Sequence, residues 1–332
     1  MKKIFLYNFI TIFILIAIIE LFFKFYLNTA LQGVDSGILQ QSDSDIVPSF
    51  NYPHIKNKKV FGVKVFTDSN GFRITEGEVN QEEKKKVYFI GGSTTFGNGV
   101  EEKNTFVGIL KKKITNYNII NASVLGSDLK NNLLIVKNKI DINNLKKIYI
   151  NFALDDIRIL NTQNQFNSNK NNDEIFFNKL KKFQLIQKIN VMLRSKSATY
   201  VWIKGVFGNS IEQNYLNSLN LYSDTVYLEY FDYYLEEFNK LDTQLKKKIT
   251  FLIIPFNQQT KEANCANEDL AEDLIKKKIR NKNFNIISLR EKFCSERKNN
   301  FFIPQDYCHL SKLGHKFVSD ILLRNFLLNE EN

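Results

Sequence analysis

Residues 87–97 read VYFIGGSTTFG, and this stretch decides the fold. Its first four residues are an apolar run that predicts a strand buried on both faces, and two glycines and Ser93 follow directly. A serine on the turn that leaves a parallel strand lies at the carboxyl end of the sheet, where open α/β folds bind ligands. The stretch lacks the P-loop pattern, the dinucleotide pattern Gly-x-Gly-x-x-Gly and the Gly-x-Ser-x-Gly elbow, so none of those sites is predicted here.

The same organisation continues on both sides of this stretch. Short apolar runs predict strands, and amphipathic stretches between them predict helices. The further predicted strands are residues 118–121, 148–152, 251–254 and 284–287, and the predicted helices are residues 105–113, 129–139, 270–280 and 312–328. Strands that alternate with helices predict an α/β fold with a parallel sheet.

A second segment with chemical potential lies near the C-terminus, where residues 306–315 read DYCHLSKLGH. The chain has three histidines, and His309 stands in an Asp-x-x-His pattern with Asp306 just ahead of the last predicted helix. A serine nucleophile needs such a pair, because the histidine accepts the hydroxyl proton and the carboxylate orients and stabilises the imidazolium. We interpret His315 as a packing or helix-surface residue.

Two more segments follow predicted strands at the same edge of the sheet. Residues 121–126 read NASVLG, and Gly126 can offer its backbone N–H to a developing oxyanion. Residues 153–156 read ALDD and place Asp155 after the third strand.

Together these four blocks resemble the SGNH hydrolase (GDSL esterase and lipase) superfamily over residues 86–323. Ser93 matches the nucleophile, Gly126 the glycine of the second block, and Asp306 and His309 the final Asp-x-x-His. Residues 69–73, SNGFR, are similar to what precedes the catalytic block in membrane-anchored bacterial members. The resemblance implies a three-layer α/β/α sandwich with a five-stranded parallel sheet of flavodoxin-like type, which acts on esters of lipids or acylated sugars through an acyl-enzyme.

This sequence departs from the family pattern at two positions. Gly92 stands where the family has Asp, and Asp155 stands where it has the Asn that completes the oxyanion hole. An ionised carboxylate would repel the oxyanion, and loss of one donor costs about 10²–10³ in rate. Three alternatives remain open: Asp155 is neutral through burial beside Asp156, the hole uses only the Ser93 and Gly126 N–H groups, or the enzyme is slow or inactive.

Residues 1–30 are predicted to form a short cytoplasmic N-terminus and a transmembrane anchor. Residues 4–19 carry no charge, and apolar residues 21–23 extend the run past Glu20. The length of this segment matches the ~20 residues that a bilayer core requires. Lys2 and Lys3 precede it, so the positive-inside rule keeps the N-terminus cytoplasmic and places the rest of the chain outside. We therefore expect a single-pass protein of the cytoplasmic (inner) membrane with an extracytoplasmic or periplasmic catalytic domain. The alternative is a cleaved secretory signal.

The remaining chain divides into two further predicted regions. Residues 31–85 read as a stalk with a small β-hairpin, because residues 60–66 predict a strand and residues 68–71 a tight turn. Residues 86–328 form the predicted hydrolase-like domain, with a helical insert at about 157–248. Its concentrated tyrosines indicate either packing onto the sheet or a lid over the site.

Charge and cysteine content restrict the partners. The 332 residues carry a net charge of +11, but the export signal argues against nucleic acid, and no cofactor or metal is predicted. With three cysteines in an exported chain, we predict a Cys265–Cys294 disulfide, with Cys308 as an alternative partner.

These observations predict a membrane-tethered serine esterase or O-acyltransferase with the triad Ser93, His309 and Asp306. The expected substrate is an acylated glycan or lipid of the cell envelope, and envelope proteins are candidate partners. The alternative function is a catalytically silent SGNH-like module that binds glycan or protein, which Asp155 favours and the intact triad disfavours.

Overall fold

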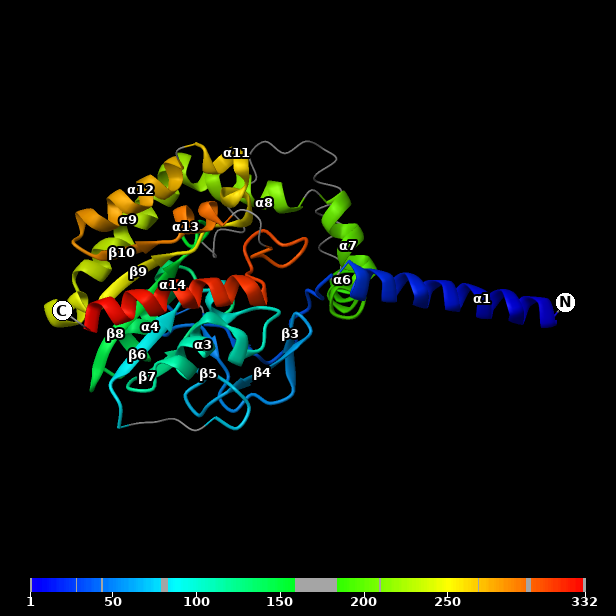
Figure 1. The fold of residues 1–332 in the computed structure, drawn as a ribbon, viewed down its shortest axis with the longest axis horizontal. Helices are drawn as coiled ribbons and strands as arrows, with labels where there is room; N and C mark the ends of the chain where they lie inside the picture. The colour runs from blue at the N-terminus through cyan, green and yellow to red at the C-terminus, as the bar shows by residue number, and fades with distance from the viewer. Residues whose placement is uncertain are drawn as a thin grey trace.

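The computed structural model describes residues 2–27, 29–42, 44–78, 83–158, 184–208, 210–267, 269–296 and 300–330. An eight-stranded sheet with strand order β10-β9-β8-β6-β7-β5-β4-β3 forms the centre of the molecule (Figure 1). Its parallel strands are β6 (Lys86–Ile90), β7 (Asn118–Asn121), β8 (Leu145–Phe152), β9 (Ile249–Ile253) and β10 (Asn285–Ser288). The predicted α/β class and the five parallel strands are confirmed.

Three antiparallel strands extend this sheet beyond β7. They are β3 (Lys58–Val60), β4 (Val63–Thr67) and β5 (Arg73–Ile74). Arg73 of β5 pairs with Asn121 of β7, so the strand and turn predicted over residues 60–71 continue the central sheet. The whole sheet therefore has eight strands rather than five. A separate ladder pairs β1 (Leu39–Gln40) with β2 (Phe50–Asn51).

Helices cover both faces of the parallel strands and make three layers. Alternate residues of a strand point to opposite faces, so Val87 and Phe89 join one buried cluster while Tyr88 and Ile90 join the other. The helices on the first face are α3 (Phe106–Lys113), α13 (Arg290–Ser295) and α14 (Lys312–Glu330), and those on the second are α4 (Leu129–Asn138), α9 (Thr225–Asn239) and α12 (Leu270–Asn281). Burial on both faces explains why these strands are continuous apolar runs.

The N-terminal helix α1 (Lys2–Leu21) continues into the wider turns of η1 (Phe22–Tyr26) and projects away from the other layers (Figure 1). Within the span Lys3–Tyr26 the helix is long and apolar enough to cross a membrane, and its most apolar window is 0% buried. The predicted membrane segment is thus a helix without a protein neighbour along most of its length.

The predicted insert is helical wherever the structure describes it, and residues 159–183 lie outside the described residues. Its elements before and after α9 are α6 (Gln184–Lys196), α7 (Ala198–Phe207), α8 (Ser210–Asn220), η3 (Leu221–Ser223) and α10 (Thr243–Lys247). In α9, Phe231 is fully buried and stacks on Phe152 of β8, with ring centroids 5.2 Å apart. The packing interpretation therefore holds for α9, which is a layer of the sandwich and not a lid.

Short elements complete the described chain: α2 (Ser93–Phe96), η2 (Glu102–Asn104), η4 (Asn257–Thr260) and α11 (Glu262–Cys265). Cys265 of α11 and Cys294 of α13 form the predicted disulfide, with Cα atoms 5.7 Å apart. Cys308 is a buried free thiol.

Candidate active site

The turn after β6 positions Ser93. Gly91 has φ 155°, and a Cβ there would lie 2.7 Å from Thr95 Oγ1, so only glycine fits between the strand and α2. Ser93 is the first residue of α2, which ends at Gly97 in the left-handed conformation with φ 83°. The serine is therefore held at the carboxyl end of the central strand by local backbone geometry.

Ser93, His309 and Asp306 form a continuous hydrogen-bonded chain. Ser93 Oγ lies 2.8 Å from His309 Nε2, and His309 Nδ1 lies 2.7 Å from Asp306 Oδ2. Because an ionised carboxylate only accepts hydrogen bonds, Nδ1 carries the proton, and Nε2 is free to accept the Ser93 hydroxyl hydrogen. This is the arrangement that a general base needs toward a serine nucleophile.

The Asp306 carboxylate also organises its own loop. Its Oδ1 accepts hydrogen bonds from the backbone N–H groups of Cys308 (3.0 Å) and His309 (2.9 Å). Burial alone would raise the pKa of Asp306, but the attraction of His309 and these hydrogen bonds hold the pKa below its ordinary value. Asp306 therefore remains an anion that orients the imidazole.

Two residues that the sequence analysis did not select also touch His309. Asn98 Nδ2 lies 3.3 Å from His309 Nε2, and the Phe61 ring packs edge-on against the imidazole with centroids 5.1 Å apart. Phe61 belongs to the region predicted as a stalk, and Asn98 lies beyond the Gly91–Gly97 block. No local pattern marks either residue, because both reach His309 only through the tertiary fold.

A pocket of about 110 Å³ opens beside Ser93, and the predicted Gly126 and Asp155 line it. Gly126 has φ 69°, and an added Cβ would meet nothing within 4 Å, which leaves its backbone accessible. Asn151 and Arg158 also line this pocket. The structure thus brings all five predicted site residues together: His309 bonds to Ser93, Asp306 bonds to His309, and Gly126 and Asp155 line the pocket beside Ser93.

The two adjacent carboxylates differ in environment. Asp155 keeps 23% of its side chain exposed and pairs with Arg158, whose Nη2 lies 3.6 Å from Asp155 Oδ2. Asp156 is buried, and burial, followed by repulsion from Asp155, raises its pKa well above the ordinary value. Burial therefore raises the pKa of Asp156, whereas Asp155 has the basic side chain of Arg158 as its partner.

Asp306, Cys308 and His309 are the one group of three metal-ligand residues found among the described residues. Burial, followed by repulsion from Asp306, raises the pKa of the Cys308 thiol well above its ordinary value. A protonated thiol is a poor nucleophile and a poor metal ligand. The cluster fits the Ser93 hydrogen-bonded chain better than a metal site or a cysteine nucleophile.

Arg73 supports the loop that follows α2. It is 1% exposed, donates to the carbonyl oxygens of Phe96, Gly97 (3.0 Å) and Val100 (2.6 Å), and its Nε lies 3.3 Å from Glu102. Asn98 lies within that loop. The SNGFR segment thus has a structural purpose, because its arginine fixes the backbone on which Asn98 meets His309.

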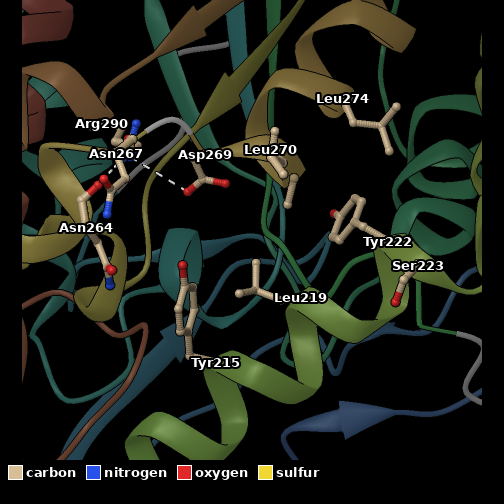
Figure 2. Close-up of a pocket in the computed structure, with 11 residues that line it drawn as sticks. Tyr215, Leu219, Tyr222, Ser223, Asn264, Asn267, Asp269, Leu270, Leu274 and Arg290 are labelled. Atoms are coloured by element: carbon tan, nitrogen blue, oxygen red, sulfur yellow. Dashed lines mark hydrogen bonds and ion pairs between the residues drawn. The ribbon is translucent and has the colours of Figure 1, made fainter.

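A second cavity, of about 550 Å³, lies between α8 and the start of α12 (Figure 2). Tyr215 and Leu219 of α8 form one side, Leu270 and Leu274 of α12 another, and Asp269 lies between them. The Tyr222 hydroxyl donates a 2.9 Å hydrogen bond to the backbone carbonyl of Leu154, the residue before Asp155. This cavity is therefore a neighbour of the catalytic pocket and contains none of the hydrogen-bonded triad.

Comparison with known proteins finds no matching family model and no matching curated protein. Among solved structures, the chain is similar to the acetyl xylan esterase AlAXEase, with 14% identity, a TM-score of 0.39, and coverage of 72% of this chain and 98% of that one. It is also similar to a lipase/acylhydrolase from Enterococcus faecalis, with 13% identity, a TM-score of 0.40, and coverage of 73% and 94%.

A lipolytic protein of the G-D-S-L family from Veillonella parvula matches with 13% identity, a TM-score of 0.37, and coverage of 73% and 98%. Each of these three matches has a TM-score of 0.40 or less and an identity of 14% or less.

Proposed function

We propose that the chain is a serine esterase, tethered to the membrane by α1, that cleaves acyl esters through a covalent intermediate on Ser93. The observation that carries the proposal is the unbroken chain of hydrogen bonds from Ser93 through His309 to Asp306, at 2.8 and 2.7 Å. His309 takes the Ser93 proton as the hydroxyl attacks the ester carbonyl, and Asp306 stabilises the imidazolium. The proton then passes to the leaving alkoxide.

The oxyanion of the tetrahedral intermediate is assigned to the backbone N–H groups of Ser93 and Gly126. Asp155 is a poor third donor because its carboxylate is partly exposed and paired with Arg158 at 3.6 Å. Water resolves the acyl-enzyme in an esterase, and a sugar hydroxyl resolves it in an O-acyltransferase. Both reactions share the first half, and the proposed substrates are acylated glycans or lipids of the envelope.

The size of the catalytic pocket favours a short acyl group. About 110 Å³ is well below the ~300–1,000 Å³ of sites that enclose a drug-sized ligand. A series of p-nitrophenyl esters tests this point with the purified full chain. We expect acetate to be cleaved at least about tenfold faster than octanoate, and equal rates would remove the size argument.

The proposed topology places the catalytic domain outside the cytoplasm. Lys2 and Lys3 at the N-terminal end of α1 support it through the positive-inside rule. The disulfide between Cys265 and Cys294 supports it as well, because disulfides persist in oxidising compartments. A C-terminal alkaline phosphatase fusion should be active in cells. A fusion active only as a cytoplasmic reporter would reverse this orientation.

The second candidate function is a silent binding module, and the carboxylate at position 155 is the observation that favours it. Turnover separates the two candidates. A purified chain that binds acylated glycan but neither hydrolyses p-nitrophenyl acetate nor transfers its acetyl group would support the binding module.

A further inference from the structure

Helices α6 and α7 lie at the point where α1 joins the rest of the protein. Both run across the axis of α1 (Figure 1). The Glu20 carboxylate, near the end of α1, accepts hydrogen bonds from Ala198 N (2.5 Å) and Thr199 N (3.2 Å) in the first turn of α7. The Phe23 ring contacts Trp202 of α7, with centroids 4.7 Å apart. A helix fixed across the end of a membrane-spanning helix lies parallel to the bilayer surface.

These two helices expose an unusual amount of apolar surface. Phe207 is 81% exposed, and Ile203, Val206 and Phe207 recur at the spacing that places them on one face of α7. The exposed apolar residues of the pair are Ile189, Val191, Met192, Ile203, Val206 and Phe207. Large contiguous apolar patches on a protein surface mark contact with a partner or a membrane.

The charge of the pair matches an anionic lipid surface. Residues 184–211 contain the basic residues Lys188, Arg194, Lys196 and Lys204 and no Asp or Glu. Apolar side chains combined with lysine and arginine are typical of helices that lie in the headgroup region of a bilayer.

The same helices adjoin the loop that carries the catalytic pair. A Cβ on Gly205 of α7 would lie 3.1 Å from the side chain of Gln305, the residue before Asp306. The segment that follows α1 reaches the site as well, because the Phe61 N–H donates to the Gly33 carbonyl at 2.7 Å while the Phe61 ring packs on His309. The catalytic loop is therefore on the membrane side of the domain.

We propose that α6 and α7 lie on the bilayer beside α1, with their apolar side chains in the headgroup region and their basic residues against anionic lipid phosphates. The pair, named here the α6–α7 seat, holds the Asp306–His309 loop over the membrane surface, where an ester carried by a lipid or a membrane-proximal glycan is within reach. The proposal rests on the proposed topology of α1, and its test does not depend on turnover.

The chain contains one tryptophan, Trp202, which makes a direct measurement practical. In a Trp202→Phe background, a single tryptophan is introduced by Phe207→Trp in the seat, by Phe13→Trp within α1, or by Tyr233→Trp on α9, where the native side chain is 59% exposed. Each full-length variant is placed in nanodiscs that contain phosphatidylglycerol and brominated lipids. The bromines lie near the glycerol end of the acyl chains for Phe207→Trp and Tyr233→Trp, and near the methyl end for Phe13→Trp, which lies near the middle of the span Lys3–Tyr26. We expect Phe207→Trp to lose about half or more of its fluorescence and Tyr233→Trp to lose almost none.

Two outcomes overturn the proposal. If Phe207→Trp is as little quenched as Tyr233→Trp while Phe13→Trp is quenched, α1 is inserted and the α6–α7 seat faces water or a protein instead. If Phe13→Trp is also unquenched, the membrane topology fails with it. Hydrolysis of p-nitrophenyl acetate by the same samples reports on the esterase proposal separately.

A charge-reversal pair tests the lipid contact independently. Lys188→Glu with Lys196→Glu should weaken the quenching of Phe207→Trp in anionic nanodiscs. The matched control, Lys112→Glu with Lys277→Glu on α3 and α12, should leave the quenching unchanged. Equal effects of the two pairs would contradict a specific contact of the seat with anionic headgroups.

Discussion

Two buried histidines flank the start of α14 and have opposite surroundings. His309 is 8% exposed and lies between the Asp306 carboxylate and the Ser93 hydroxyl. His315 is fully buried, its Nδ1 accepts the Phe106 N–H at 3.2 Å, and its Nε2 has no hydrogen-bond partner among the described residues. Both histidines are therefore buried, and their hydrogen-bond partners differ because their neighbouring groups differ.

His315 satisfies a donor at the start of α3, where the first N–H groups of a helix have no partner within the helix. Burial, followed by repulsion from Arg73 and His309, lowers the pKa of His315 to about 3, so it remains a neutral acceptor. The carboxylate beside His309 instead stabilises the protonated imidazole that forms during proton transfer. In the proposed mechanism, a carboxylate partner thus distinguishes the general base His309 from the structural acceptor His315.

The largest expected effect concerns turnover. Ser93→Ala and His309→Ala should each lower kcat for p-nitrophenyl acetate by about 10⁴-fold or more, because either change removes the activated nucleophile. His315→Ala should change kcat by no more than a few-fold at a temperature where it is folded. Comparable losses for the two histidines would break the comparison.

The converse effect concerns stability. His315→Ala should lower the free energy of unfolding by about 2–4 kcal/mol, because it leaves a cavity and a buried Phe106 N–H without an acceptor. His315→Asn retains an oxygen that can accept from this N–H and should be less destabilising. Chemical denaturation measures both, and an unchanged midpoint for His315→Ala would show that α3 does not depend on His315.

The pH dependence of stability sharpens the same point. An unfolded histidine takes up a proton near its ordinary pKa of 6.5, whereas folded His315 stays neutral until about pH 3. The unfolded state therefore binds more protons in this window, and stability falls by about 1.4 kcal/mol per unit as pH drops below about 6. This slope should be reduced in His315→Asn.

Titration of Asp306 changes the stability in a different pH range from titration of His315. Its pKa is lowered in the folded state, so its stabilisation is complete above the ordinary value of 3.8 and is lost only below it. Identical slopes for the wild type and His315→Asn between pH 6 and pH 4.5 would contradict the assignment to His315.

The smallest expected effect concerns the two adjacent carboxylates. Asp155→Asn places an amide donor beside the oxyanion and should raise kcat/KM for the acetyl ester by up to about tenfold, since Arg158 already offsets part of the charge. Asp156→Asn is the control, because Asp156 is buried and its raised pKa favours the neutral acid. A large loss in Asp155→Asn would assign the carboxylate a role that an amide cannot replace.

The sequence predicted the parts of the molecule whose information is local. The parallel strands are buried on both faces and appear as apolar runs, and the Ser93 turn and the Asp306-x-x-His309 loop are short blocks. The sequence does not predict that the three antiparallel strands join the central sheet. The link is β5, which has only two residues, Arg73–Ile74, and pairs with β7 only between Arg73 and Asn121. Edge pairing of this kind depends on tertiary position, not on hydrophobic period.

The contacts around the site also depend on the tertiary fold and not on local sequence patterns. Asn98 and Phe61 reach His309 from segments without a distinguishing pattern. The pairing of Arg158 with Asp155 and the burial that raises the pKa of Asp156 also become visible only in the structure. The residues proposed as reactive lie in short motifs that the sequence shows, whereas the groups that contact them are identified only in the fold.

Covalent labelling tests the central claim, the activation of Ser93 by His309, most directly. The full-length chain is treated with a fluorophosphonate probe, and the modified peptide is identified by mass spectrometry in the wild type, Ser93→Ala, His309→Ala and folded His315→Ala. We expect one modified site, at Ser93, in the wild type and in His315→Ala. Ser93→Ala should carry no label, and labelling of His309→Ala should be slower by orders of magnitude. Label that persists in Ser93→Ala, or equal labelling rates with and without the His309 imidazole, would contradict it.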